Sequence, residues 1–149
     1  MRKRLLMLLA VLMSLSLVAA ACGDDDDTEA GSGDGGSESD CPDGPVEGTA
    51  DGTKIGLLFD LTGRGDQSFN DSAACGLDRA ATDFEIAPSE SEPTSEADRT
   101  ERLNLLADQG NELVIGVGFL WGDALAAGAV AYPDTSFAII DFVVEEPNV

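Results

Sequence analysis

Short apolar runs alternate with amphipathic stretches along the chain from about residue 53 onward. The runs with the length and composition of buried strands are 54–59, 112–117 and 136–140, with 84–88 as a possible fourth. Between these runs, apolar residues recur at helical spacing in stretches that begin near Ser68, after Ser95 and at Phe119. Strands that alternate with helices in this way predict an α/β fold, a parallel sheet with flanking helices.

Acidic residues lie directly after the first and last predicted strands. Asp60 follows the first strand, Asp141 follows the last, and the segment from Asp60 to Asn70 leads into the first helix. The carboxyl ends of parallel strands share one edge of a sheet, and ligands bind at that edge. Asp60 provides acceptor oxygens, Asn70 provides a donor and an acceptor, and Phe69 provides a flat apolar face. These groups suit a planar ligand that forms hydrogen bonds better than they suit a phosphate.

Each candidate residue also has a purely structural interpretation. Ser68 or Asn70 could be the helix N-cap, Phe69 could belong to the core, and Asp141 could cap a turn. The apolar face predicted for the first helix comprises Phe69, Ala73, Leu77, Ala80 or Ala81, and Phe84. Trp121, which is the single tryptophan of the chain, is expected to serve packing.

The first 21 residues have the pattern of an export signal. Three bases precede an apolar run from Leu5 to Val18, which is short for a membrane span. The run ends in small residues followed directly by Cys22, as in a bacterial lipoprotein signal, so Cys22 is expected to carry lipid. Ordinary signal cleavage beside an unrelated cysteine is the alternative.

Residues 22–52 are predicted to form a flexible, acidic Gly/Ser tether between the lipid and a folded domain at 53–149. The segment from Gly23 to Gly52 has few apolar residues and no base, so it cannot build a core. The chain carries a net charge of −21, and removal of the three signal bases leaves 5 bases against 29 acids, or −24. This charge argues against binding to nucleic acid and against electrostatic attachment to anionic lipid.

The remaining cysteines and the absence of histidine limit the possible chemistry. Cys41 and Cys75 could form a disulfide in an exported protein, although the sequence does not show whether they approach each other. They lack the spacing of a zinc site, and without histidine there is no Ser–His or Cys–His catalytic pair. The segment Gly63–Gly65 lacks the third glycine of a dinucleotide loop and the lysine of a phosphate loop. We therefore expect no metal, no cofactor and no enzymatic activity.

Six segments of the chain resemble, in the same order, the BMP family (basic membrane protein, or PnrA-like lipoproteins). They are 54–60, 66–70, 73–77, 115–119, 123–125 and 132–141. The resemblance implies the first lobe of a type I periplasmic-binding-protein-like, Rossmann-like fold. It also implies a substrate-binding protein of an ABC importer that captures purine nucleosides and hands them to permease and ATPase subunits. Such a protein would be lipid-anchored at the extracytoplasmic face of the plasma membrane.

The same resemblance assigns roles to the candidate residues. Phe69 would stack on the purine ring. Asn70 and Asp60 would form hydrogen bonds with the base, and Asp141 would make a further polar contact with the ligand. Gly118 and Phe119 would shape the cleft. Family members have a second, similar lobe, and this chain ends about where they cross to it, so we expect an N-terminal part only. The alternatives are the same fold with another small ligand, such as a sugar or signalling molecule, and an exported α/β enzyme.

Overall fold

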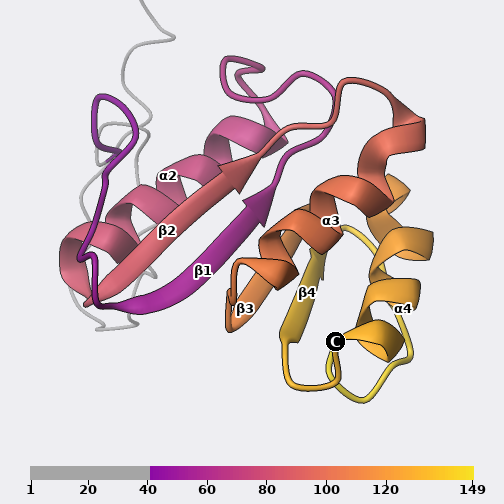
Figure 1. Ribbon diagram of the computed structural model, residues 1–149. Helices are drawn as coiled ribbons and strands as arrows, with labels where there is room; N and C mark the ends of the chain where they lie inside the picture. The colour runs from indigo at the N-terminus through magenta and orange to yellow at the C-terminus, as the bar shows by residue number, and fades with distance from the viewer. Residues whose placement is uncertain (1–40) are drawn as a thin grey trace, which may run out of the picture. The chain divides into compact units, whose positions relative to one another are not determined.

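A computed structural model describes residues 41–149, which form one parallel four-stranded sheet with helices on both faces. The strands are β1 (Thr53–Leu58), β2 (Ile86–Ser91), β3 (Leu113–Val117) and β4 (Ser136–Ile140). Their order in the sheet is β2-β1-β3-β4, and all three neighbouring pairs are parallel (Figure 1). Strand β2 therefore lies on one side of β1, and the later strands β3 and β4 lie on its other side.

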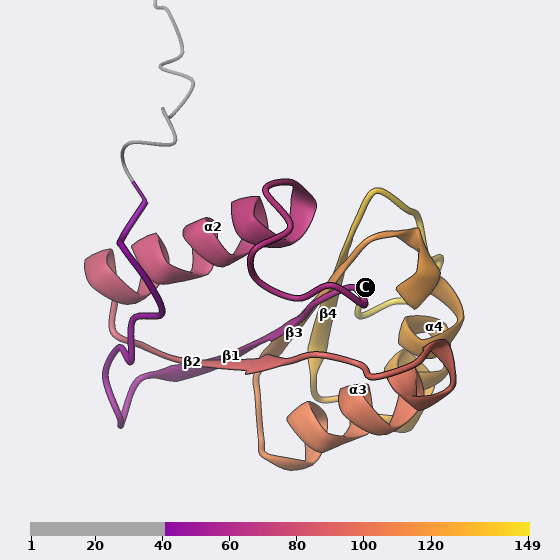
Figure 2. The same cartoon turned by 90° about the horizontal axis from the view of Figure 1, so that it is seen from above.

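Three helices cover the sheet. They are α2 (Phe69–Asp83), α3 (Arg99–Asp108) and α4 (Gly122–Ala131), and the short 3₁₀ turns η2 (Glu96–Asp98) and η3 (Phe119–Trp121) precede the last two. Helix α2 lies on one face, whereas α3 and α4 lie on the other (Figure 2). The predicted α/β fold with a parallel sheet is confirmed. Among the helices of residues 41–149, none has the length and apolar character needed to cross a bilayer.

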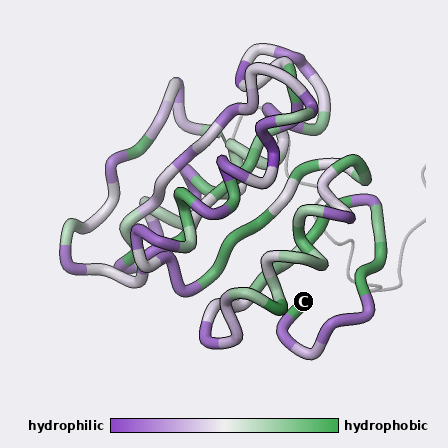
Figure 3. The backbone as a smooth tube through the Cα atoms, turned by 45° about the vertical axis from the view of Figure 1, so that its right-hand side comes forward, coloured by the Kyte–Doolittle hydropathy of each residue, from purple (hydrophilic) through white to green (hydrophobic). Residues whose placement is uncertain are grey.

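The core consists of two apolar layers, one on each face of the sheet. Successive strand residues point to opposite faces, so Leu57 packs in the layer under α2 while Leu58 packs in the layer under α3 and α4. Fully burying a side chain of this size contributes about 1.5–3 kcal/mol. In Figure 3 the strand that crosses the centre of the view is coloured hydrophobic, and several turns at the lower edge are coloured hydrophilic.

Strand β2 differs from its prediction, because it begins at Ile86 and runs to Ser91, past the predicted end at residue 88. It pairs along its whole length with β1, and no strand of residues 41–149 pairs with its other side. An edge strand needs fewer apolar residues and tolerates Pro88, which has no N–H to donate. The apolar pattern alone therefore placed this strand too early.

The buried face of α2 also differs from the predicted one. Its apolar buried residues are Ala74, Leu77 and Ala81, whereas Phe69 and Phe84 are 58 % and 68 % exposed. The buried stripe is thus offset from the predicted stripe, and both ends of the helix leave an aromatic ring in solvent.

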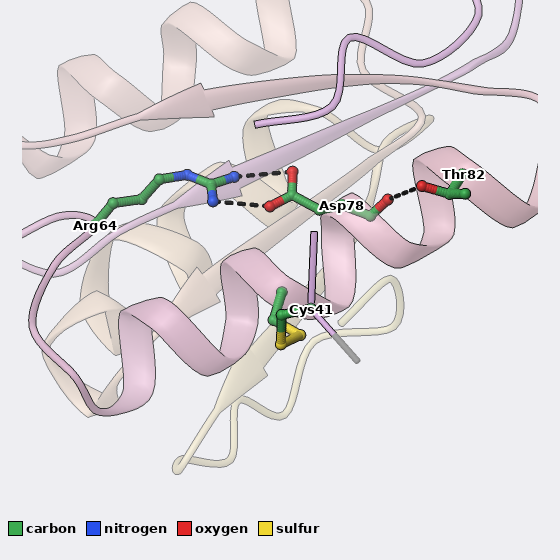
Figure 4. Close-up of a disulfide and its surroundings, with 5 residues drawn as sticks. Cys41, Arg64, Asp78 and Thr82 are labelled. Atoms are coloured by element: carbon green, nitrogen blue, oxygen red, sulfur yellow. Dashed lines mark hydrogen bonds and ion pairs between the residues drawn. A yellow bond between two sulfur atoms is a disulfide. The ribbon is translucent and has the colours of Figure 1, made fainter. Parts of the chain in front are cut away.

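The end of the predicted tether is packed on the domain. Cys41 forms a disulfide with Cys75 of α2, with 5.2 Å between their Cα atoms (Figure 4). The Val46 N–H donates to the Asp78 carboxylate at 3.0 Å, and the N–H of Thr49 donates to a carbonyl at the start of β2. The folded unit thus extends ahead of the predicted boundary at residue 53. The predicted signal, the lipidation at Cys22 and most of the tether lie outside the described residues.

Candidate ligand-binding site

A cavity of about 160 Å³ lies beyond the carboxyl ends of β1, β3 and β4. It is lined by Asp60, Thr62, Asp66, Phe69, Asn70, Val117, Gly118, Phe119 and Asp141. In the order β2-β1-β3-β4, the connections leave β1 in one direction and β3 in the other. This reversal separates the loops that follow β1 and β3, and such a switch point is where open α/β sheets bind ligands.

The structure brings all four predicted site residues to this cavity. Phe69 lies at the first position of α2 and is more than half exposed, so it is not a core residue. Asp60 and Asp141 follow β1 and β4 as the sequence predicted, and Asn70 lies one position into α2. Gly118 and Phe119, which were expected to shape the cleft, also line it.

Asn70 has a scaffolding role that the sequence did not indicate. Its side chain is buried, its Oδ1 accepts from the Asp60 N–H at 2.9 Å, and its Nδ2 donates to Thr62 Oγ1 at 3.1 Å. An amide can form further hydrogen bonds with its second N–H and second lone pair. The hydrogen bonds of the Asn70 side chain to Asp60 and Thr62 nevertheless hold the loop after β1 in place.

Asp60 presents its two carboxylate oxygens to different surroundings. Oδ1 accepts from the Leu61 N–H at 2.8 Å and from Arg99 Nη2 at 2.6 Å. Within residues 41–149, Oδ2 accepts no hydrogen bond, and a Cβ placed on Gly118 would lie 3.6 Å from it. One oxygen is therefore committed to the protein, while the other lies beside the cavity lining.

Two lining residues have left-handed backbone conformations. Gly118 has φ +94° and Asp141 has φ +69°. Glycine adopts this region at no steric cost, and aspartate is among the few other residues that tolerate it. The backbone can therefore turn sharply out of β3 and β4 at the rim of the cavity.

Ser68 is the N-cap residue of α2, as one of the structural interpretations predicted, but the capping hydrogen bonds are accepted by the side chain of Asp66. Its carboxylate accepts from the N–H groups of Ser68, Asn70 and Asp71 at 2.9–3.1 Å. Burial raises the pKa of this carboxyl, but the hydrogen bonds from the backbone of Asp71, Asn70 and Ser68 outweigh burial and leave the pKa below its usual value. The Ser68 side chain makes no cap hydrogen bond.

The Asp66→Ala variant is expected to lose about 1 kcal/mol of stability at neutral pH, as helix caps do. A carboxyl whose folded pKa is depressed contributes fully above its unfolded value, here near 3.8, and loses that contribution as the pH falls through the lower folded pKa. Urea denaturation of both proteins at several pH values would measure the difference. If the difference in unfolding free energy between the parent and Asp66→Ala stayed constant into strongly acidic solution, the capping role of the Asp66 carboxylate would be contradicted.

Arg64 secures the loop between β1 and α2, a role that was not predicted from the sequence. Its guanidinium donates to both oxygens of Asp78 at 2.8 and 3.0 Å (Figure 4). It also pairs with Glu90. The hydrogen bonds to Glu90 and Asp78 raise the Arg64 pKa. The loop that carries Thr62 and Asp66 is thereby tied to α2 and to β2.

A larger groove of about 770 Å³ lies along α2, between that helix and residues 41–44. Both polar and apolar residues line this groove. One of its polar side chains, Asp78, is already paired with Arg64. The groove lies away from the lining residues after β3 and β4, so the smaller cavity is the candidate site. Within the described part of the chain, no group of three or more acidic or cysteine side chains is placed to hold a metal.

Comparison with solved structures places this lobe in a class. A solute-binding protein of an ABC transporter system from Aeropyrum pernix K1 is 39 % identical, with a TM-score of 0.59. The match covers 62 % of this chain and 25 % of that one. The fold is that of a lobe of ABC solute-binding proteins, in agreement with a cavity at the switch point of a parallel sheet.

The family follows from the sequence. Residues 53–149 match the family described as ABC transporter substrate-binding protein PnrA-like, and this chain belongs to that family. An uncharacterised lipoprotein of Pyrococcus furiosus is 40 % identical over 89 residues, which are 59 % of this chain and 22 % of that protein. The ABC transporter nucleoside-binding protein BmpA of Lactococcus lactis is 31 % identical over 97 residues, 62 % of this chain and 28 % of BmpA. The chain thus spans about a quarter of the length of these relatives.

Proposed function

We propose that this chain supplies one wall of a purine-nucleoside site in a lipid-anchored receptor for an ABC importer. The observation that carries the proposal is the exposed Phe69 ring at a cavity whose rim also holds carboxylates. A flat apolar ring beside hydrogen-bond acceptors matches a nucleobase, which has an aromatic face and N–H groups at its edge. The relationship to a nucleoside-binding protein of L. lactis supports the same ligand class.

The charges at the cavity favour a neutral ligand. Asp60, Asp66 and Asp141 all line it, while the nearby Arg99 is paired with Asp60. Carboxylates accept hydrogen bonds and repel phosphate, so this wall is suited to ligand N–H or O–H groups. We therefore expect nucleosides to bind and the corresponding nucleotides to be excluded.

In a chain that carries both lobes, Phe69→Ala is expected to weaken nucleoside binding by about 1–3 kcal/mol, the scale of stacking between a base and an aromatic ring. Titration calorimetry with inosine, guanosine and adenosine would measure the loss. The matched control is Phe84→Ala, because Phe84 is also an exposed ring beside α2 but does not line the cavity. Equal affinities for the parent and Phe69→Ala would remove Phe69 from the site.

The two other candidate functions are separated by simple assays. Another small ligand, such as a sugar, would bind without depending on Phe69. An exported enzyme would consume nucleosides in a turnover assay, whereas a receptor would return them unchanged. Receptor function agrees with the family, whose members are substrate-binding proteins.

Lipid attachment at Cys22 is part of the proposal, with the small residues before Cys22 as its basis. Several acyl chains anchor a protein stably because each buried methylene contributes about 0.8 kcal/mol. The Cys22→Ser variant is expected to leave the membrane fraction, whereas Cys41→Ser is expected to stay there. Cys22→Ser that remained in the membrane pellet after an alkaline wash would exclude this mode of anchoring.

A further inference from the structure

Arg99 is a buried cation directly behind the cavity. It is the first residue of α3, its side chain is 5 % exposed, and it follows a capping box formed by Ser95 and Asp98. The Asp98 carboxylate accepts from the Ser95 N–H at 3.0 Å, which fixes the turn from which Arg99 projects. The charge is therefore held at a defined position and is seldom in contact with water.

Trp121 provides the surface on which the Arg99 guanidinium lies. The guanidinium carbon is 5.0 Å from the centre of the indole ring, within the range of a cation–π contact. Trp121 is itself fully buried, and its indole N–H donates to the Phe59 carbonyl at 3.2 Å. The indole is thus fixed to the last core residue before Asp60.

The guanidinium has only one polar contact within the described residues. Its Nη2 donates to Asp60 Oδ1 at 2.6 Å, whereas its buried Nε and Nη1 have no hydrogen-bond partner. A buried cation with several carboxylate partners would serve mainly to join elements. Here a single hydrogen bond, donated by a buried guanidinium that lies over the Trp121 ring, reaches one oxygen of one carboxylate.

We infer that Arg99 is a positioning residue for the ligand-binding carboxylate. Arg99, held over the Trp121 ring, fixes the rotamer of Asp60 by engaging Oδ1, and so leaves Oδ2 as the acceptor presented to a ligand donor. This inference rests on the proposed function, since it assigns a role to Arg99 through a residue of that site. Arg99 itself does not line the cavity.

The first test requires no ligand. In the isotopically labelled chain, three-bond couplings of the Asp60 side chain report whether it occupies one rotamer. We expect one rotamer in the parent and averaging in Arg99→Met. The matched control is Arg102→Met, which removes another arginine of α3 whose one ion pair within residues 41–149 is with Asp98, at 3.6 Å. A single, parental rotamer in Arg99→Met would overturn the inference.

A lysine variant covers the case in which Arg99→Met does not fold. Arg99→Lys keeps the charge and the apolar stem but has no planar group to lie on the indole. Partial averaging of the Asp60 couplings is expected in this variant. A fully fixed Asp60 in Arg99→Lys would show that the planar contact with Trp121 has no positioning role.

The second test separates positioning from a general structural role. Inosine is titrated into a labelled chain that carries both lobes, and dissociation constants are taken from amide shift changes. Arg99→Met is expected to weaken binding about tenfold, the scale of one charge-assisted hydrogen bond that loses its alignment. In an Asp60→Asn background the same change should have little effect, because Arg99 acts through the carboxylate.

The outcomes distinguish the two proposals. An equal loss of affinity in both backgrounds would assign Arg99 a structural role alone and overturn the inference. If the parent that carries both lobes does not bind inosine, the proposed function fails, while the Asp60 couplings still decide whether Arg99 positions that side chain.

Discussion

Replacement of both Cys41 and Cys75 by serine is expected to lower the free energy of unfolding by about 4 kcal/mol. The disulfide closes a loop across a sequence separation of 34 residues, and opening a loop of this size returns that much conformational entropy to the unfolded chain. Guanidinium denaturation of the oxidised parent and the double variant would measure the difference. Replacing both cysteines together avoids the new pairings that a single thiol could form.

The reduced parent provides the matched control for this prediction. Reductant should shift the parental midpoint toward that of the serine variant and should leave the variant unchanged. If reduction leaves the parental midpoint in place, the bond between Cys41 and Cys75 does not constrain the domain. A loss of about 4 kcal/mol would be a large part of the 5–15 kcal/mol typical of a folded domain.

Trp121→Ala is expected to destabilise the domain by about 3–5 kcal/mol, the range for large aromatic residues removed from a core. Trp121 is fully buried, donates to the Phe59 carbonyl and supports the guanidinium of Arg99. Its loss leaves a cavity, an unpaired carbonyl and an unsupported buried cation. Thermal and chemical denaturation would both measure the effect.

Leu120→Ala is the control for the tryptophan variant, because Leu120 is the preceding residue of the same turn and is 40 % exposed. Leu120→Ala should lower the free energy of unfolding much less than Trp121→Ala does. Comparable losses in the two variants would mean that the whole turn, and not the buried indole, determines the effect.

The sequence predicted most of the sheet because β1, β3 and β4 are apolar runs that end at recognisable turns. The strand 136–140 was placed at the residues where it occurs. The edge strand β2 was misplaced because, within residues 41–149, it pairs with another strand on one side only. Residues of such a strand can be polar, so the apolar run does not mark its bounds. The order of the strands in the sheet could not be predicted from the hydrophobic pattern, because periodicity reports burial and not which strands are neighbours.

The candidate site could be located from sequence, but the roles of its residues could not all be assigned. Asp60 and Asp141 follow strands whose ends meet at one edge, so their proximity could be predicted. The buried hydrogen bonds of Asn70 could not, because they depend on how the loop after β1 folds. Arg99 was missed because an arginine between acidic residues near the start of a helix has the pattern of a solvated surface.

The disulfide also determines where a mechanical load enters the domain. Tension on the chain ahead of residue 41 passes through the bond to Cys75 and reaches the middle of α2. The segment between Cys41 and β1 lies inside the covalent loop and does not bear that tension. The strand that leads to Asp60 is therefore shielded from forces applied through the N-terminal segment.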